Sequence, residues 1–280
     1  MNRNRLWLAA FLCYIALSSS ALVAQSGLRS PLTMKSIDEY LLFYPAKFPA
    51  GNWEPANLVY QDVYFNSADG NKLHGWYCPN PNPRGVVLLA HGNAGHIADR
   101  AAWLRYLQQE LKLTVFAFDY RGYGRSEGKP TVKGAIEDSA AARAKLRELA
   151  NVQDKDLILM GESLGGAMVI QLANQSPPRA LIVQSTFPSL REVATVHFPN
   201  LAWLVPKNKL VSTEAIKNYR GPLLQSHGTD DRTIPFALGK KLFDAAPGPK
   251  EFFPIRDADH NDWLTSEYLK QLEQFLQKLP

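Results

Sequence analysis

The sequence predicts an α/β fold in which helices cover both faces of a doubly wound, mostly parallel β-sheet. Short apolar runs alternate along the chain with amphipathic or alanine-rich stretches, which is the order that repeated strand–helix units produce. One of these runs, Leu157 to Met160, leads directly into Gly161 to Gly165, which has the pattern Gly-x-Ser-x-Gly. In sheets of this kind ligands bind at the carboxyl ends of the strands, so Ser163 is placed where a site is expected.

Length and composition fit one large domain. The chain has 280 residues, of which 46% are hydrophobic, so it can supply a sizeable core. Its formal charge of +5 falls to +3 when the two arginines of a predicted targeting segment are left out, because 29 basic residues then face 26 acidic ones. This weak and scattered charge argues against nucleic-acid binding. The two cysteines are Cys13 and Cys78, and Cys13 belongs to the targeting segment, so no internal disulfide is expected in the domain.

Residues 1–24 are predicted to form a signal peptide or a membrane anchor. Two arginines precede an apolar run from Leu6 to Leu17, and small residues follow up to Ala24. Cleavage after Ala24 would place Leu22 where a small residue is preferred, whereas the apolar run is of borderline length for a bilayer, so both alternatives stay open. We therefore expect an exported protein, either periplasmic or secreted, or anchored in a membrane through this segment and facing outward.

Residues 25–57 contain several prolines among aromatic residues and predict an extended lead-in. The domain is expected over residues 58–280, and it begins with a β-hairpin. The strands of this hairpin, Val59 to Phe65 and Leu73 to Cys78, flank the turn pair Asp69-Gly70.

Apolar runs in the rest of the domain predict strands buried in a parallel sheet. These strands are Gly85 to Ala90, Leu113 to Phe118, Leu157 to Met160, Ala180 to Gln184, Pro222 to Ser226 and Glu251 to Ile255. One helix is expected to end near Leu111, and the others span Thr131 to Ala150, Ser163 to Gln175, Phe236 to Ala246 and Asp262 to Leu279. Residues 186–219 break the alternation, and their length predicts a small cap insertion over the carboxyl edge of the sheet. Aromatic residues of this cap, such as Phe198 and Trp203, are expected either to line an apolar pocket or only to seal the cap onto the core.

Ser163 is the candidate nucleophile. Gly161 and Gly165 lack the Cβ atoms that would clash where the strand and the following helix approach each other, so the serine can stand at a sharp turn with its hydroxyl exposed. The helix that begins after Ser163 aims free N–H groups and the positive end of its dipole at any oxyanion formed there.

A serine hydroxyl needs a histidine to accept its proton, and the histidine needs an acid that fixes its tautomer. In doubly wound hydrolases these groups follow the order serine, acid, histidine along the chain. His260 follows the last predicted strand and is the candidate base. Asp230 and Asp231 follow the preceding strand, and only one of two neighbouring side chains in an extended loop can face His260. His227 comes before both aspartates and is expected to be structural.

The oxyanion hole is expected to be formed by two backbone N–H groups. Leu164, directly after the nucleophile, supplies one of them, and Asn93, which follows the strand ending at Ala90, supplies the other. The sequence contains no cluster with metal-ligand spacing and no glycine-rich phosphate loop, so no metal and no cofactor are predicted.

Four motifs together resemble the α/β-hydrolase superfamily, and within it the branch that contains bud-emergence-related proteins and protein depalmitoylases. They are His91 to Gly95, Asp119 to Ser126, Gly161 to Gly166 and His227 to Asp231. In this family the loop acid is the fifth residue from the histidine of the last motif, so the resemblance assigns the acid to Asp231 rather than Asp230.

These observations predict a serine hydrolase that cleaves a carboxylic ester or thioester through an acyl-enzyme. The expected substrate is a small-molecule or lipid-like acyl compound. A serine peptidase of the same fold is one alternative, and a non-catalytic binding or scaffold module that kept the fold is another. The oligomeric state and the natural substrate cannot be read from the sequence.

Overall fold

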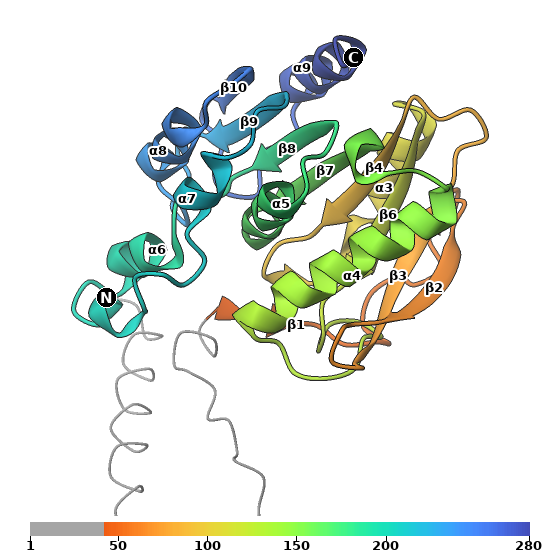
Figure 1. Ribbon diagram of the computed structural model, residues 1–280, viewed down its shortest axis with the longest axis horizontal. Helices are drawn as coiled ribbons and strands as arrows, with labels where there is room; N and C mark the ends of the chain where they lie inside the picture. The colour runs from red at the N-terminus through yellow and green to blue at the C-terminus, as the bar shows by residue number, and fades with distance from the viewer. Residues whose placement is uncertain (1–41) are drawn as a thin grey trace, which may run out of the picture. The chain divides into compact units, whose positions relative to one another are not determined.

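The computed structural model describes residues 42–280 (Figure 1). The predicted signal peptide or anchor, residues 1–24, and the first part of the lead-in lie outside the described residues. Within residues 42–280, no helix has both the length and the apolar character needed to cross a bilayer.

An eight-stranded sheet forms the centre of the fold, with the strand order β10-β9-β8-β7-β4-β6-β3-β2. Its strands are β2 (Gln61–Asn66), β3 (Lys72–Cys78), β4 (Gly85–Ala90), β6 (Leu113–Asp119), β7 (Leu157–Glu162), β8 (Ala180–Gln184), β9 (Leu223–Gly228) and β10 (Lys250–Ile255). Strand β3 is antiparallel to β2 and β6, whereas the other neighbouring pairs are parallel. The prediction of a doubly wound, mostly parallel sheet is confirmed.

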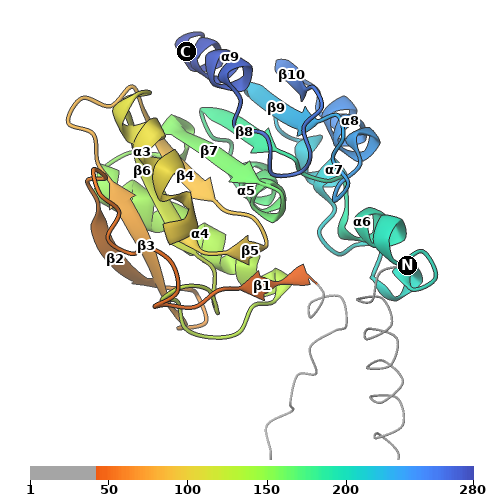
Figure 2. The ribbon, with the colours of Figure 1, turned by 180° about the vertical axis from the view of Figure 1, so that it is seen from behind.

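Helices cover both faces of this sheet (Figures 1 and 2). One face is covered by α4 (Val132–Ala150), α5 (Leu164–Gln175), α7 (Ser212–Ile216) and α8 (Phe236–Ala245). The opposite face is covered by α3 (Ala101–Gln109), which follows the short helix η1 (Ile97–Arg100), and by α9 (Ser266–Gln277). Each helix buries an apolar face against the strands, so two hydrophobic clusters lie on the two sides of the sheet.

The last helix begins four residues later than the sequence pattern predicts. Thr265 is its N-cap, because the Thr265 side chain accepts a hydrogen bond from the Tyr268 N–H at 3.2 Å. The residues before it, from His260 to Leu264, therefore form a loop at the carboxyl end of β10. Because the helix begins only at Ser266, the predicted base, His260, lies on a loop rather than near the start of a helix.

Residues 186–219 contain α6 (Leu190–His197), the single turn η3 (Ala202–Leu204) and α7. Helix α7 is part of the body of the domain, since Ala215 and Ile216 belong to the same hydrophobic cluster as α5. By contrast, large apolar side chains of α6, η3 and their connection are exposed, including Phe198 at 36% and Trp203 at 69%. Both views place α6 beyond the ends of the strands (Figures 1 and 2), and an ion pair between Glu192 of α6 and Lys241 of α8 joins it to the body of the domain.

Candidate active site

Ser163 lies at a sharp turn between β7 and α5. Its backbone dihedral angles, φ 50° and ψ −114°, fall in a region that side chains rarely adopt. A Cβ on Gly161 would come within 2.4 Å of the Gly165 backbone, and a Cβ on Gly165 would come within 2.0 Å of the Ala90 carbonyl oxygen. The turn therefore requires glycine at both positions, as the spacing of the motif predicts.

The structure brings Ser163, His260 and Asp231 together. His260 Nε2 lies 3.0 Å from Ser163 Oγ, and His260 Nδ1 lies 2.8 Å from Asp231 Oδ2. A carboxylate can only accept, so Nδ1 carries the proton and Nε2 is free to accept the Ser163 hydroxyl hydrogen. This is the arrangement in which a histidine can act as a base toward a serine.

Asp231 is held as a carboxylate by four donors. Its Oδ1 accepts hydrogen bonds from the N–H groups of Thr233 and Ile234, at 2.9 and 2.7 Å. Its Oδ2 accepts from His260 and lies 3.2 Å from His227 Nε2. Burial by itself raises the pKa of Asp231, but the hydrogen bonds from His227 and His260 outweigh it and hold this pKa well below its usual range.

The neighbouring Asp230 is exposed and does not face His260. Its Oδ1 accepts a hydrogen bond from the Thr229 hydroxyl at 3.2 Å. His227, expected to be structural, is fully buried, and its Nε2 lies 2.7 Å from the Ile234 carbonyl oxygen as well as close to Asp231. It therefore supports the loop that carries Asp231, a contact that no local sequence pattern indicates.

The two expected oxyanion donors, Asn93 and Leu164, follow the neighbouring strands β4 and β7. The cavity is lined by Asn93 and Ser163, and neither the Asn93 N–H nor the Leu164 N–H donates to an acceptor within residues 42–280. The Asn93 peptide is fixed in place, because its carbonyl oxygen accepts from the Tyr44 N–H at 2.9 Å and from the Tyr123 hydroxyl at 2.6 Å. The first strand of the described chain, β1 (Tyr44–Pro45), pairs with β5 (Ala94–Gly95) at this loop.

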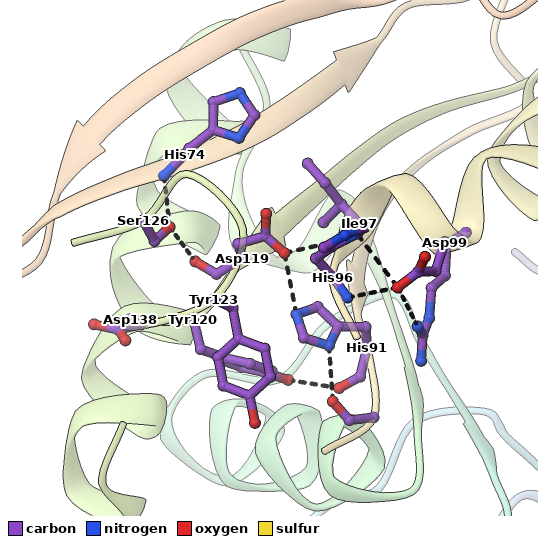
Figure 3. A network of polar contacts seen from close by, with 12 residues as sticks. His74, His91, His96, Ile97, Asp99, Asp119, Tyr120, Tyr123, Ser126 and Asp138 are labelled. Carbon is purple, nitrogen blue, oxygen red and sulfur yellow. Dashed lines mark hydrogen bonds and ion pairs between the residues drawn. The ribbon is translucent and has the colours of Figure 1, made fainter. Parts of the chain in front are cut away.

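A buried polar network lies behind this loop (Figure 3). His91 Nδ1 donates to the Gly92 carbonyl oxygen at 2.7 Å, and His91 Nε2 lies 3.5 Å from Asp119 Oδ1. Asp119 Oδ1 also accepts from the Ile97 N–H at 2.9 Å, so the carboxylate joins both ends of the segment from His91 to Ile97. Burial raises the pKa of Asp119, but contacts with His74 and His91 outweigh burial, so this pKa is lowered. The Asp119 motif, noted in the sequence only as a resemblance, thus positions the candidate oxyanion loop.

Glu162 and Arg100 form an ion pair that the sequence analysis missed. Glu162 Oε1 accepts from Arg100 Nε at 3.0 Å, from Arg100 Nη2, and from the Gly92 N–H at 3.0 Å. Burial raises the pKa of Glu162, but the Arg100 guanidinium outweighs it and the pKa is lowered. Glu162 occupies a variable position of the serine motif, and Arg100 is 62 residues away, so no sequence signal indicates their contact.

The cavity at Ser163 has a volume of about 190 Å³, and polar and apolar atoms contribute about equally to its walls. It is lined by Gly92, Asn93, Ala94, Arg100, Glu162, Ser163, Ser185, Thr233, His260, Asn261 and Trp263. Phe198 and Trp203 are not among these residues, and both are exposed. Phe198 and Trp203 therefore neither line this cavity nor belong to the buried core, whereas Phe187 of the same stretch is buried in the core cluster.

A serine, a histidine and an aspartate in contact at the carboxyl edge of a doubly wound sheet form the arrangement found in hydrolases of the Ser-His-Asp type. The family model described as serine aminopeptidase, S33, matches residues 81–215 of this chain. An uncharacterized protein of Mycobacterium tuberculosis is 36% identical over 79% of this chain and 80% of its own length. The α/β-hydrolase domain-containing protein WAV2 of Arabidopsis thaliana is 34% identical, with 79% of this chain and 80% of that protein covered.

Solved structures of esterases have the same fold. The Pyrococcus furiosus esterase Pf2001 matches with a TM-score of 0.70 and 20% identity, over 85% of this chain and 98% of that one. Acetyl xylan esterase 1 of Thermoanaerobacterium matches with a TM-score of 0.62 and 18% identity, over 81% and 85%. This chain belongs to the α/β-hydrolase superfamily, and it is a hydrolase of that fold.

Proposed function

We propose that the protein is a serine hydrolase that cleaves a carboxylic ester or thioester through an acyl-enzyme. The observation that carries this proposal is the continuous contact from Asp231 through His260 to Ser163 Oγ. An ester or thioester is favoured over a peptide because Glu162, the acidic side chain among the residues that line the cavity, is paired with Arg100 and is therefore not free to hold a peptide amino terminus.

In the first half of the reaction Ser163 Oγ attacks the substrate carbonyl carbon while its proton passes to His260 Nε2. The carbonyl oxygen becomes an oxyanion that accepts from the N–H groups of Asn93 and Leu164. The bond to the leaving group then breaks, and His260 returns the proton to the departing oxygen or sulfur. In the second half water attacks the acyl-enzyme by the same route, which releases the acid and restores Ser163.

Labelling with a fluorophosphonate tests the proposal directly. The probe should modify the full chain at Ser163, and Ser163→Ala and His260→Ala should each abolish labelling, because the first lacks the nucleophile and the second lacks its base. Hydrolysis of p-nitrophenyl esters without hydrolysis of aminoacyl amides would support an esterase, whereas the reverse would indicate a peptidase. A folded protein that neither labels nor hydrolyses any of these substrates would point to a binding or scaffold module.

Export and membrane association form a second part of the proposal, and they depend on residues 1–24 alone. Fractionation of cells that express the full chain should find the protein outside the cytoplasm. Sequencing of the mature amino terminus then distinguishes a cleaved signal peptide from a retained anchor. A protein found only in the cytoplasm with Met1 still present would contradict both.

A further inference from the structure

The lead-in to the sheet lies against the loop that carries Asn93, and its strand β1 is the neighbour of β5 in this loop (Figure 2). Asn93 Nδ2 donates to the Leu42 carbonyl oxygen at 2.9 Å, and the Tyr44 N–H donates to the Asn93 carbonyl oxygen at 2.9 Å. The Ala46 N–H donates to the Gly95 carbonyl oxygen at 3.2 Å. The lead-in thus holds Asn93 at both its side chain and its main chain.

One buried side chain fastens the lead-in to the domain. Among residues 42–50 only Phe43 is buried, whereas the Tyr44 side chain is 56% exposed. The Phe43 ring lies edge-on to the Tyr123 ring, with ring centroids 6.5 Å apart, and the Tyr123 hydroxyl donates to the Asn93 carbonyl oxygen. Phe43 therefore supports both donors to this oxygen, because it precedes Tyr44 in the chain and packs against Tyr123.

The lead-in also bonds to the loop that follows β6. The Gly124 N–H donates to the Ala46 carbonyl oxygen at 2.8 Å, and the Phe48 N–H donates to the Gly124 carbonyl oxygen at 3.1 Å. Lys47 Nζ donates to the Ser126 carbonyl oxygen at 3.0 Å. The lead-in is therefore fixed between two loops, and its main chain makes most of these contacts.

An oxyanion donor is effective only while its N–H keeps its direction, and a misplacement of about 1 Å can cost roughly 100-fold in rate. The peptide that carries the Asn93 N–H is fixed on its Gly92 side, where His91 Nδ1 donates to the Gly92 carbonyl oxygen and the Gly92 N–H donates to Glu162. On its Asn93 side it is fixed by Tyr123 and by the lead-in.

We propose that residues 42–46 are a positioning strap for the oxyanion hole. They contribute no reacting group, but they hold the Asn93 N–H in the direction that stabilises the transition state. The inference rests on the proposed function, since it names positioning residues for the same serine hydrolase site. Loss of the strap should lower kcat with little change in KM, because the oxyanion forms only during the reaction.

Phe43→Ala in the full chain tests the strap. Its kcat for p-nitrophenyl butyrate should fall about 10–100-fold while KM stays within about twofold of the wild type. Phe43→Leu keeps a large apolar side chain and should restore kcat to within about threefold of the wild type.

Two further measurements separate positioning from a general structural effect. Butylboronic acid forms a tetrahedral adduct with Ser163 that places an oxygen where the oxyanion would lie. Its inhibition constant for Phe43→Ala should therefore rise by about the factor by which kcat/KM falls. The pH profile of kcat/KM should keep its wild-type shape, because the contact from Asp231 through His260 to Ser163 is untouched.

Phe65→Ala is the matched control. Phe65 is buried in the same hydrophobic cluster as Phe43, but it belongs to β2 and packs against Phe116, with ring centroids 5.6 Å apart. Its loss should lower Tm, as the loss of Phe43 should, because both variants leave a cavity in the core. The kcat of Phe65→Ala should stay within about twofold of the wild type.

A pair of variants at Tyr44 tests the strap without changing a buried side chain. Tyr44→Pro removes the N–H that donates to Asn93, whereas Tyr44→Ala removes the same exposed side chain and keeps this N–H. Tyr44 precedes Pro45, which favours the extended backbone that proline also tolerates. The kcat of Tyr44→Pro should be at least about fivefold below that of Tyr44→Ala, since one hydrogen bond is lost. This pair decides the matter if Phe43→Ala does not fold.

Four results would each overturn the inference. They are a kcat of Phe43→Ala no lower than that of Phe65→Ala, a change in KM alone, an unchanged inhibition constant for the boronic acid, and equal kcat values for the two Tyr44 variants. A wild-type chain that neither reacts with the fluorophosphonate nor hydrolyses the ester would contradict the proposed function, and the inference with it.

Discussion

His260 Nε2 lies 3.0 Å from Ser163 Oγ although 97 residues separate the two in the chain. The contact exists because β7 and β10 end at the same edge of one sheet, so the loops that follow them meet there. The loop that carries Asn93, the candidate oxyanion donor, follows β4, the direct neighbour of β7. The order of the strands, rather than closeness in sequence, thus assembles the site.

Asp231→Asn should lower kcat/KM for an ester by about 10³–10⁴-fold, because an amide no longer fixes His260 in the tautomer that accepts the serine proton. Asp230→Asn is the matched control and should keep nearly full activity, since Asp230 is exposed and does not contact His260. Steady-state kinetics of both variants decide the assignment. An inactive Asp230→Asn beside an active Asp231→Asn would reverse it.

The carboxylate of Asp231 should also make the folded state sensitive to acid. Its pKa is lowered in the folded state, so its ionisation adds stability that is fully present above the ordinary Asp value of about 3.9 and is lost as pH falls toward the folded value. Urea unfolding of the wild type and Asp231→Asn should therefore give curves whose separation is constant near pH 7 and shrinks below about pH 4. A separation that does not change with pH would contradict the cited hydrogen bonds.

Ser163→Gly should be more stable than Ser163→Ala. Both variants lose the hydroxyl, but alanine keeps a Cβ at φ 50°, where glycine is unstrained. We expect a difference of about 1 kcal/mol, or roughly 2–4 °C in Tm, by thermal unfolding. A Ser163→Gly variant that melts below Ser163→Ala would show that the turn is not strained.

Glu162→Ala should lower kcat by about 10–100-fold with little change in KM, because the Gly92 N–H loses its acceptor and the loop that carries Asn93 is released. It should also lower stability by about 2 kcal/mol, since Arg100 is left without its partner. Glu162→Gln keeps an acceptor for Gly92 and should recover most of kcat.

Glu251→Ala removes an ion pair with Lys278 at the amino end of β10 and serves as the control for general destabilisation. Its kcat should equal that of the wild type. If Glu162→Ala raised KM alone, Glu162 would act in substrate binding rather than in holding the oxyanion loop.

The buried strands could be predicted because their physical signal is local. The run from Gly85 to Ala90 is apolar throughout and forms β4 with the same bounds. Ser163, His260 and Asp231 could be placed because the chain order of such sites, together with the family resemblance, limits the candidates to loops that follow strands. The structure brings these three residues together, and their catalytic role stays a prediction for the experiments above.

The contacts between distant loops could not be predicted, because nothing in the sequence near Glu162 indicates that Arg100 lies beside it. The position of Phe198 and Trp203 could not be predicted either. Aromatic residues favour burial on average, but whether a turn folds over a cavity or away from it depends on packing around it. Here Arg191 donates to the carbonyl oxygens of Val205 and Trp203, and it holds the turn in its exposed position.

The strand order also determines when activity can arise during synthesis. The candidate nucleophile and both candidate oxyanion donors follow β4 and β7, whereas the candidate acid and the candidate base follow β9 and β10. A nascent chain that has emerged only as far as β8 already presents Ser163, but it has neither Asp231 nor His260 to activate it. If the proposed mechanism holds, the growing polypeptide cannot hydrolyse esters until its last strand joins the sheet, and a chain released before that point should be inactive.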